Sequence, residues 1–300
     1  MKKQTLLLGA HISIAGGYDK ALKQAASIGC TTLQIFTKSN RQWAAKPITD
    51  DEANLFKKTG KELGLENVIV HASYLINLAS ANKQVQEKSL HALIQELERC
   101  HQLGIRYLVL HPGSNGECKK EEGLQLIADG INNALEALNP DNKTMILLET
   151  MAGQGSTLCS TFEEIGIIRS LIDKKNYVGV CVDTCHIFAA GYDLRTKKEY
   201  NKTWDALDSA IGIENVKVIH CNDSKKECGS RVDRHEAIGN GQLEDKSFEL
   251  LFNDRRFFDI PKILETPKTD IQEDLLNMQH IITLLTEKTK NQLNIFVKTT

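Results

Sequence analysis

The sequence predicts a single-domain (β/α)8 TIM barrel of the α/β class, and three observations support this prediction. The chain has 300 residues, which suits one barrel of about 250 residues with short additions. Eight apolar runs of strand type recur along it at intervals of a few tens of residues. Segments with helical periodicity lie between these runs, so strands and helices alternate along the chain.

The predicted strands are continuous apolar runs bounded by turn residues, a pattern typical of parallel strands that are buried on both faces. In chain order they are residues 5–11, 31–37, 67–73, 106–112, 144–150, 178–184, 216–223 and 261–267. A doubly wound open sheet has the same alternation and is the alternative topology.

Helices are predicted where apolar residues recur at intervals of three and four positions, at residues 19–29, 88–104, 121–138, 161–172 and 270–287. The first two end at Gly29 and Gly104, as helices commonly do. Only five prolines occur, and no Gly-, Ser- or Pro-rich segment marks a boundary. We therefore expect one domain over residues 1–300, with a C-terminal helix at about 270–290 and no separate linker.

The composition is that of an ordinary globular protein, with 41% apolar and 25% charged residues. No apolar run approaches the roughly 18 residues of a membrane span, and the N-terminal run is too short for a signal peptide. Eight cysteines without a C-x-x-C pair favour reduced thiols packed as small apolar residues. We therefore expect a cytoplasmic protein in a reducing compartment. The net charge of −2 does not by itself indicate a nucleic-acid partner.

Candidate metal ligands stand at or just beyond the carboxyl ends of six consecutive predicted strands. They are His71, His111, Glu149, Asp183, His186, His220, Asp233, His235 and Glu265. In a barrel, these strand ends open on one face, where active sites lie. Each residue alone is more often a satisfied polar group or an ion-pair partner. Together, buried carboxylates and imidazoles without cations would cost several kcal/mol each, so the cluster indicates metal binding.

Histidine and carboxylate ligands without thiolate suit Zn²⁺, with Mn²⁺ or Fe²⁺ possible in part. Nine ligands are too many for one tetrahedral ion, so we expect three ions with one shared carboxylate. Asp183 lies on a strand and His186 beyond the following turn, so they are expected to bind neighbouring ions. Asp233 and His235 share a face in extended backbone. They suit a single ion, which His186 could complete.

Six segments together resemble the endonuclease IV family of apurinic/apyrimidinic (AP) endonucleases. They are HASYLINLAS (71–80), HPGS (111–114), ETMAGQG (149–155), VDTCHIFAAGYD (182–193), HCNDSKKECGSRVDRHEAIGNG (220–241) and LETPKTD (264–270). The resemblance implies a tri-zinc TIM barrel that repairs DNA. Such an enzyme hydrolyses duplex DNA 5′ to an abasic site, leaving a 3′-hydroxyl and a 5′-deoxyribose phosphate, and it also trims blocked 3′ ends.

The resemblance also assigns the nine candidate ligands to three zinc ions. It gives His71 and His111 to the first, Glu149 to the bridge, Asp183, His220 and Glu265 to the second, and His186, Asp233 and His235 to the third. The expected mechanism uses a zinc-activated hydroxide, with Glu149 and Glu265 as the catalytic carboxylates that orient it.

Three further residues match the DNA-inserting positions of the family: Arg41 in TKSNRQW, and Tyr74 and Leu75 in HASYL. Taken alone, each would be interpreted as an ordinary loop or surface residue. Asn240 departs from the family pattern, in which an acidic residue is common. This departure puts substrate contacts in doubt more than the metal chemistry.

The role of Gln34 stays open, and His11 is expected to orient a metal ligand rather than to bind an ion. We expect a monomer that acts on double-stranded DNA with abasic sites or blocked 3′ ends and has no membrane partner. Three Zn²⁺ ions would add +6 to the charge of −2 and give +4. Two alternatives remain: a sugar isomerase or epimerase related to xylose isomerase, and a metal-stabilised scaffold that binds DNA without cutting it.

Overall fold

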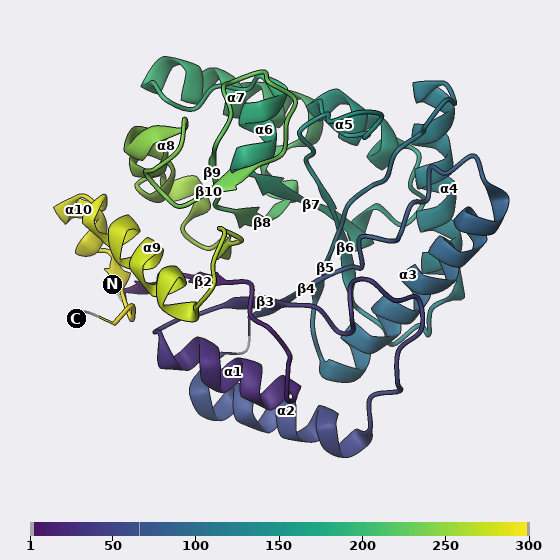
Figure 1. Ribbon diagram of the computed structural model, residues 1–300, viewed down its shortest axis with the longest axis horizontal. Coiled ribbons are helices and arrows are strands. Elements are labelled where there is room, and N and C mark those ends of the chain that lie inside the picture. The colour runs from purple at the N-terminus through teal and green to yellow at the C-terminus, as the bar shows by residue number, and fades with distance from the viewer. Residues whose placement is uncertain (1–2, 66, 299–300) are drawn as a thin grey trace.

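The computed structural model describes residues 3–65 and 67–298 and confirms the predicted barrel (Figure 1). The predicted domain bounds at residues 1 and 300 lie outside the described residues. Eight parallel strands form the sheet in the order β2-β11-β8-β7-β6-β5-β4-β3. They are β2 (Leu8–Ala10), β3 (Leu33–Ile35), β4 (Val68–His71), β5 (Tyr107–Leu110), β6 (Met145–Glu149), β7 (Val178–Asp183), β8 (Val216–His220) and β11 (Lys262–Leu264).

The barrel is nearly closed by contacts between the carboxyl ends of its first two strands, β2 and β3. His11 and Gln34 form a parallel bridge there, and the Ile12 backbone N–H donates to the Gln34 carbonyl at 2.8 Å. The doubly wound open sheet is therefore excluded, because its two edge strands would not meet.

Helices surround the strands as an outer ring (Figure 1). They are α1 (Tyr18–Ser27), α2 (Asp50–Leu63), α3 (Lys83–Leu103), α4 (Lys120–Ala137), α5 (Phe162–Ser170), α6 (Thr184–Ala190), α7 (Lys197–Ile211), α8 (Glu244–Phe252), α9 (Ile271–Thr283) and α10 (Glu287–Lys290). Short 3₁₀ turns are η1 (Lys175–Tyr177), η2 (Ile213–Asn215) and η3 (Arg255–Phe257). None of the helices in the described part of the chain has the length and apolar character to cross a bilayer.

Side-chain alternation along the strands places the candidate ligands. A separate buried cluster is formed by Ile69, Val109, Leu147, Cys181, Val218 and Ile263, one from each of six neighbouring strands. Because successive strand side chains point to opposite faces, the residue two positions further on faces the same way. Those residues are His71, His111, Glu149, Asp183, His220 and Glu265. The six strand-derived ligands therefore continue the same face of the sheet beyond this cluster.

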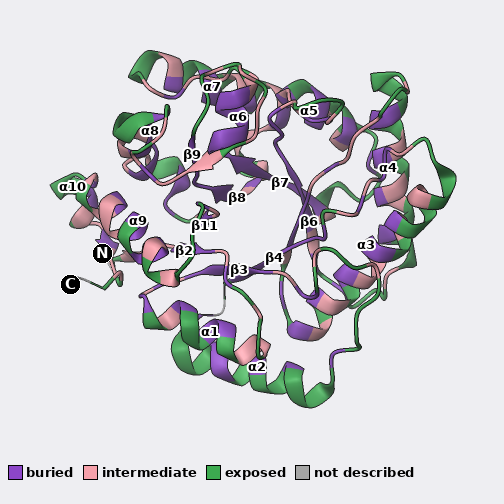
Figure 2. Cartoon of the chain, viewed as in Figure 1, coloured by how far each residue is buried: buried purple, intermediate pink, exposed green. Residues whose placement is uncertain are grey.

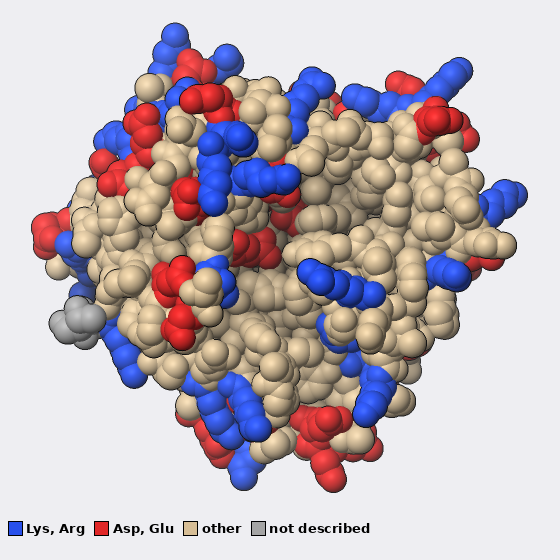
Figure 3. Space-filling model, viewed as in Figure 1, with Lys and Arg blue, Asp and Glu red and all other residues tan. Residues whose placement is uncertain are grey.

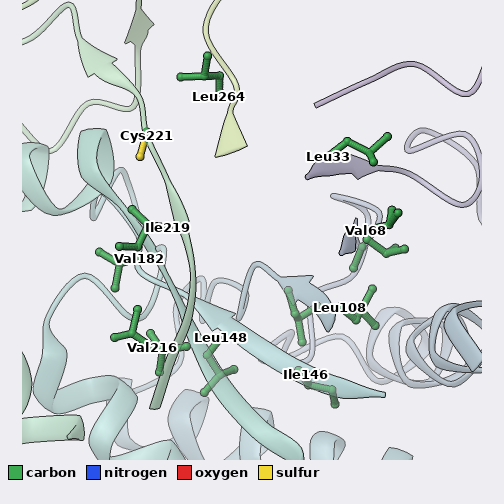
Figure 4. Close-up of a cluster of buried hydrophobic side chains, with 14 of the residues drawn as sticks. Leu33, Val68, Leu108, Ile146, Leu148, Val182, Val216, Ile219, Cys221 and Leu264 are labelled. Carbon is green, nitrogen blue, oxygen red and sulfur yellow. The ribbon is translucent and has the colours of Figure 1, made fainter. Parts of the chain in front are cut away.

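The opposite face of the strands packs against the helices (Figure 4), with Val68, Leu108, Leu148 and Ile219 among the side chains there. Figure 2 shows buried residues on the strands and on one side of most helices, with exposed residues on the outer side. Apolar packing against the helices therefore encloses the sides of the barrel, and the candidate metal ligands lie at the carboxyl ends of the strands.

The structure departs from the predicted elements in a few places. The predicted run 5–11 is divided, since β1 (Gln4–Thr5) pairs with β12 (Leu293–Asn294) and only the later residues join the barrel. Helices α2, α6, α7 and α8 were not predicted. The predicted helix at 270–287 is divided in two. Helix α9 ends at Thr283, and α10 begins at Glu287, where the Thr286 side chain caps it by accepting a hydrogen bond from the Thr289 backbone N–H.

Candidate metal centre

Glu149, at the end of β6, is fully buried in the middle of the candidate ligands. Its Oε2 atom lies 3.2 Å from His71 Nε2 and 3.1 Å from His111 Nε2. Its Oε1 atom lies 3.0 Å from His220 Nδ1 and 3.5 Å from His186 Nδ1. Oε2 therefore faces His71 and His111, while Oε1 faces His220, which is the placement expected of a carboxylate shared between two ions.

Two compact sets of ligand atoms meet at this carboxylate, and within each set the atoms lie within 4.8 Å of one another. The first is His71, His111 and Glu149, and the second is Glu149, Asp183, His220 and Glu265. These are the residues that the sequence assigned to the first and second ions. The presence of an ion in each set stays a prediction.

The third predicted set is more open because its residues come from a loop, a short hairpin strand and α6. Asp233 Oδ2 lies 3.2 Å from His186 Nε2, and Asp233 Oδ1 lies 3.4 Å from His235 Nε2. Asp183 also lies close enough to share an ion with His186 and His235, and Cys185 lies near Asp233 and His235. The separation of Asp183 from His186 between two ions thus stays a prediction, and a thiol lies closer than the sequence suggested.

The turn from β7 into α6 sets the positions of Asp183 and His186. Asp183 caps the helix, since its Oδ1 accepts a hydrogen bond from the His186 backbone N–H at 2.9 Å. Its Oδ2 accepts from Asn222 Nδ2 at 2.7 Å. The His186 ring then donates from Nδ1 to the Thr150 carbonyl at 2.8 Å, which directs Nε2 toward Asp233.

Carbonyl groups orient two further imidazoles in the same way. His71 donates from Nδ1 to the Ala72 carbonyl at 2.7 Å, and His235 donates from Nδ1 to the Glu265 carbonyl at 3.1 Å. The buried Nε2 atoms of His186 and His235 have no hydrogen bond of acceptable angle, although Asp233 lies beside both. A buried imidazole lone pair next to a carboxylate fits a metal ion, so the residues present suit the implied group.

Charge in this centre is balanced between carboxylates and imidazoles. Burial opposes ionisation of Glu149, but His220 and His111 hold the pKa of its carboxyl well below the usual range. Burial likewise opposes protonation of His186, but Asp183 and Asp233 raise its pKa to about 10. Protons on the imidazoles therefore neutralise the carboxylates, and metal ions would replace these protons on binding.

Gln34 and His11 lie behind the second set. The Gln34 side chain donates from Nε2 to Glu265 Oε1 at 2.6 Å and accepts from His220 Nε2 at 2.8 Å. His220 therefore presents Nδ1 to the centre. His11 Nδ1 lies 3.0 Å from Gln34 Nε2 and 3.4 Å from Glu265 Oε1, and burial lowers the pKa of its imidazole. Gln34, whose role the sequence left open, orients two candidate ligands together.

The predicted DNA-contact residues lie in loops at the same mouth. The half-exposed Tyr74 ring packs against His71 and His111, with ring centroids 5.1 Å away in both cases. Leu75 is partly buried and Arg41 is exposed. A cavity of about 390 Å³ lies beside them, and its lining includes Tyr74, His111 and Asp233. Figure 3 shows acidic side chains inside the central hollow of this face and lysine or arginine on its rim.

Asp223 holds the loop around the third set, and the sequence interpretation missed it. Its carboxylate accepts hydrogen bonds from the backbone N–H groups of Gly239, Gly241 and Leu243, each at 3.0 Å. It belongs to β9 (Asp223–Ser224), which pairs with β10 (His235–Glu236). The aspartate in HCND and the two glycines in IGNG were the available signal, because a short carboxylate commonly binds such backbone turns.

The comparisons with known proteins decide the family. A family model described as a xylose isomerase-like TIM barrel matches residues 22–286. A probable endonuclease 4 of Chloroflexus aurantiacus is 48% identical over 271 residues, covering 90% of this chain and 95% of that protein. The chain belongs to the endonuclease IV family. The resemblance noted from the sequence is thereby confirmed.

Other relatives and solved structures extend the match. An apurinic-apyrimidinic endonuclease of Caenorhabditis elegans is 40% identical over 278 residues, 92% of this chain and 69% of that protein. The crystal structure of endonuclease IV from Thermus thermophilus has a TM-score of 0.81 at 35% identity, covering 92% of this chain and 98% of that one. A D-tagatose 3-epimerase-like protein has a TM-score of 0.70 at 18% identity, covering 92% and 96%, and shares the fold alone.

Proposed function

We propose that this chain is a metal-dependent AP endonuclease of DNA repair. It hydrolyses the phosphodiester 5′ to an abasic site in duplex DNA, leaves a 3′-hydroxyl and a 5′-deoxyribose phosphate, and trims blocked 3′ ends. The observation that carries the proposal is the Glu149 carboxylate, which has one oxygen facing His71 and His111 and the other facing His220. Such a shared carboxylate is typical of metal sites built for in-line displacement at phosphorus.

We assign three zinc ions to the nine predicted ligands, in the three sets given by the family resemblance. When bound, these ions supply an activated water at neutral pH and offset the charge that develops on the phosphate. Glu149 and Glu265 are the carboxylates that orient the attacking water. Glu265 is suited to this role, because Gln34 holds its Oε1 and leaves Oε2 facing His220 at 3.2 Å.

Metal ions would also make the mouth more attractive to a phosphate. Four carboxylates lie there, those of Glu149, Asp183, Asp233 and Glu265, and in the metal-free chain imidazole protons balance their charge. Adding +6 to the chain charge of −2 gives +4, with the added charge located where the phosphate arrives. The acidic balance of the chain is thus compatible with a DNA substrate.

Recognition of an abasic site needs no base-specific contact, because a nucleotide without its base is easy to unstack. We assign Tyr74 and Leu75 to the wedge that enters the gap and Arg41 to the residue that fills the stack. Tyr74 suits this role, since its ring is half exposed and is supported from behind by Phe36 at 5.6 Å. The enzyme would act as a monomer in the cytoplasm, where its eight cysteines stay reduced.

The test is cleavage of an end-labelled duplex that holds one abasic analogue, beside the same duplex without the lesion. We expect nicking only on the 5′ side of the lesion, without added magnesium, and a product that a polymerase extends. Cleavage should disappear with a chelator and return with zinc. Binding without nicking by the zinc-loaded chain would favour the scaffold alternative, and turnover of a ketose panel instead would favour a sugar epimerase.

A further inference from the structure

The proposed DNA contacts come from two neighbouring loops at the barrel mouth. The β3–α2 loop (residues 36–49) carries Arg41, and the β4–α3 loop (residues 72–82) carries Tyr74 and Leu75. We call these two segments the recognition loops. Strands β3 and β4, which they follow, are hydrogen-bonded neighbours. The question is what fixes the two loops relative to each other.

A buried lysine lies inside the first recognition loop. The Lys38 side chain is only 3% exposed, and its ammonium donates to the backbone carbonyls of Gln42 at 3.3 Å and Trp43 at 2.9 Å. The backbone therefore curls around this ammonium, with Arg41 in the enclosed segment. An ammonium held by carbonyls on the far side of the turn fixes the shape of the turn.

Glu96 of α3 provides the opposite charge beneath the loop. Its Oε1 atom lies 3.8 Å from Lys38 Nζ, and its Oε2 atom accepts from the Thr37 hydroxyl at 2.5 Å. Its side chain is 1% exposed. Arg99, one turn later on the same helix face, donates to the carbonyls of Thr37 at 2.6 Å and Lys46 at 2.8 Å. Helix α3 thus holds both ends of the loop.

The second recognition loop is tied to the same network. The Ser73 hydroxyl donates to the Asn40 carbonyl at 2.9 Å and accepts from the Leu75 backbone N–H at 3.3 Å. Burial raises the pKa of the Glu96 carboxyl, and the nearby Ser73 backbone N–H opposes that rise. One serine therefore links the residue before Arg41 to the residue after Tyr74, and one carboxylate lies beside both loops.

We propose that the buried Lys38–Glu96 pair, together with Ser73, is a positioning clamp that holds the two recognition loops in one fixed arrangement for lesion recognition. This inference rests on the proposed function, because it takes Arg41, Tyr74 and Leu75 as DNA contacts. Stability is a poor explanation for the pair, since removing two charges from water offsets much of their attraction. Preorganisation explains the pair better, because loops that are already ordered do not lose conformational entropy when DNA binds.

The test uses Glu96→Gln, Lys38→Met, the double variant and Ser73→Ala, each loaded with zinc. Glu62→Gln is the matched control, since Glu62 pairs with Lys58 on the outside of α2 with both side chains well exposed. KM and kcat are measured on the abasic duplex, together with metal content and melting temperature. Acrylamide quenching of tryptophan fluorescence reports on the loop without DNA, because Trp204 is fully buried and Trp43 lies in the loop.

We expect Lys38→Met and the double variant to raise KM about 10- to 100-fold with a much smaller change in kcat. Metal content should stay unchanged, and Trp43 should become more accessible to acrylamide. Because the double variant removes both buried charges, it should melt near the wild type and still keep the raised KM. Ser73→Ala should show a smaller rise in KM, and Glu62→Gln none.

Wild-type KM and wild-type quenching in the double variant or in Ser73→Ala would overturn the clamp. A uniform fall in kcat and metal content would also overturn it, because it would indicate general misfolding. Failure of the wild-type enzyme to nick abasic DNA would instead refute the proposed function, and the quenching measurement would still decide whether Lys38 and Glu96 order the loop.

Discussion

Strand β11 has a charged residue at each of its two ends, which lie at opposite ends of the barrel. The surrounding groups stabilise these two charges in different ways. Lys262 starts the strand and donates to the carbonyls of Phe257 and Ile260, above the Phe252 ring. Burial lowers the pKa of its ammonium to about 8. Glu265 follows the strand at the other end, and its carboxyl is partly buried. Partial burial opposes its ionisation, but His220 and His11 hold its pKa well below the usual range.

This difference indicates that the amino end of the barrel contributes to stability and that the carboxyl end carries the chemistry. At the amino end, a single charge is satisfied by fixed backbone groups, and no other titratable side chain is needed. At the carboxyl end, imidazoles and carboxylates balance one another's charge, so the group as a whole can exchange protons for metal ions. This agrees with the general division of such barrels, in which the carboxyl ends carry the site and the amino ends carry stability.

The largest predicted effect is that of Glu149→Gln. The amide keeps the shape but removes the charge, and its NH₂ group turns a donor toward imidazole nitrogens that need an acceptor or an ion. We expect nicking of the abasic duplex to fall at least about 10³-fold. The melting temperature of the metal-free chain should also fall, because the imidazoles around this position lose their buried anionic partner.

A parallel assay of Lys262→Met is the matched comparison at the other end of the barrel. Its nicking rate should stay within about twofold of the wild type, because no contact joins it to the metal centre. Equal losses of activity in the two variants would contradict the division between the two ends.

The next effect in size is that of Gly241→Ala. An added Cβ would lie 2.5 Å from the Ser224 carbonyl and would also clash with the Asp223 carboxylate. Ser224 pairs with His235 in the hairpin, so relieving the clash must move a ligand of the third set. We expect the chain to lose about one metal ion of three, and nicking to fall about 10- to 100-fold.

Gly64→Ala is the control for this substitution. Gly64 adopts φ +69° at the end of α2, and an added Cβ there would meet nothing within 4 Å. It should cost about 1 kcal/mol of stability and no metal. Full metal content in Gly241→Ala would show that the Asp223 loop does not position the third set.

A smaller effect is predicted for the pH dependence of stability. The pKa of Lys262 is about 8 in the folded chain, below its ordinary value of 10.5. Between these pH values the unfolded chain binds a proton that the folded chain lacks, so the free energy of unfolding rises with pH. Chemical denaturation should show a rise of roughly 3 kcal/mol from pH 8 to 10.5 relative to Lys262→Met. A pH-independent difference between the two proteins would contradict burial of the ammonium.

The smallest predicted effect is that of Cys185→Ser. The thiol lies near Asp233 and His235, but burial raises its pKa well above the ordinary value, so it is a poor ligand as it stands. Metal content should be unchanged, and the nicking rate should stay within about twofold. Loss of an ion in this variant would make Cys185 a ligand and would correct the interpretation of the cysteines as packing residues.

The strand-derived part of the site could be predicted from the sequence because two regularities determine it. Parallel strands of a barrel share one carboxyl end, and side chains alternate, so His71 and Glu265 converge although about two thirds of the chain separates them. The third set follows neither rule. Asp233 lies in an irregular loop between β9 and β10, and this hairpin is held by the Asp223 carboxylate, which binds two glycine N–H groups just beyond β10.

The remaining omissions have similar causes. Gln34 occupies an ordinary strand position, and nothing in TTLQIFT indicates that its amide joins Glu265 to His220. Helix α2 was overlooked because few of its positions are apolar, although Thr49 and Glu52 form a capping box at its start. The Lys38–Glu96 pair joins a loop to a helix nearly sixty residues later, a contact that only the folded chain reveals.

The most direct test of the central claim is a zinc titration of the metal-free chain, with nicking of the abasic duplex measured at each added equivalent. The three ligand sets around Glu149 predict that three equivalents bind and that full activity requires all of them. Full activity at one equivalent, or nicking by the metal-free chain, would contradict the account of this barrel mouth as a three-metal centre.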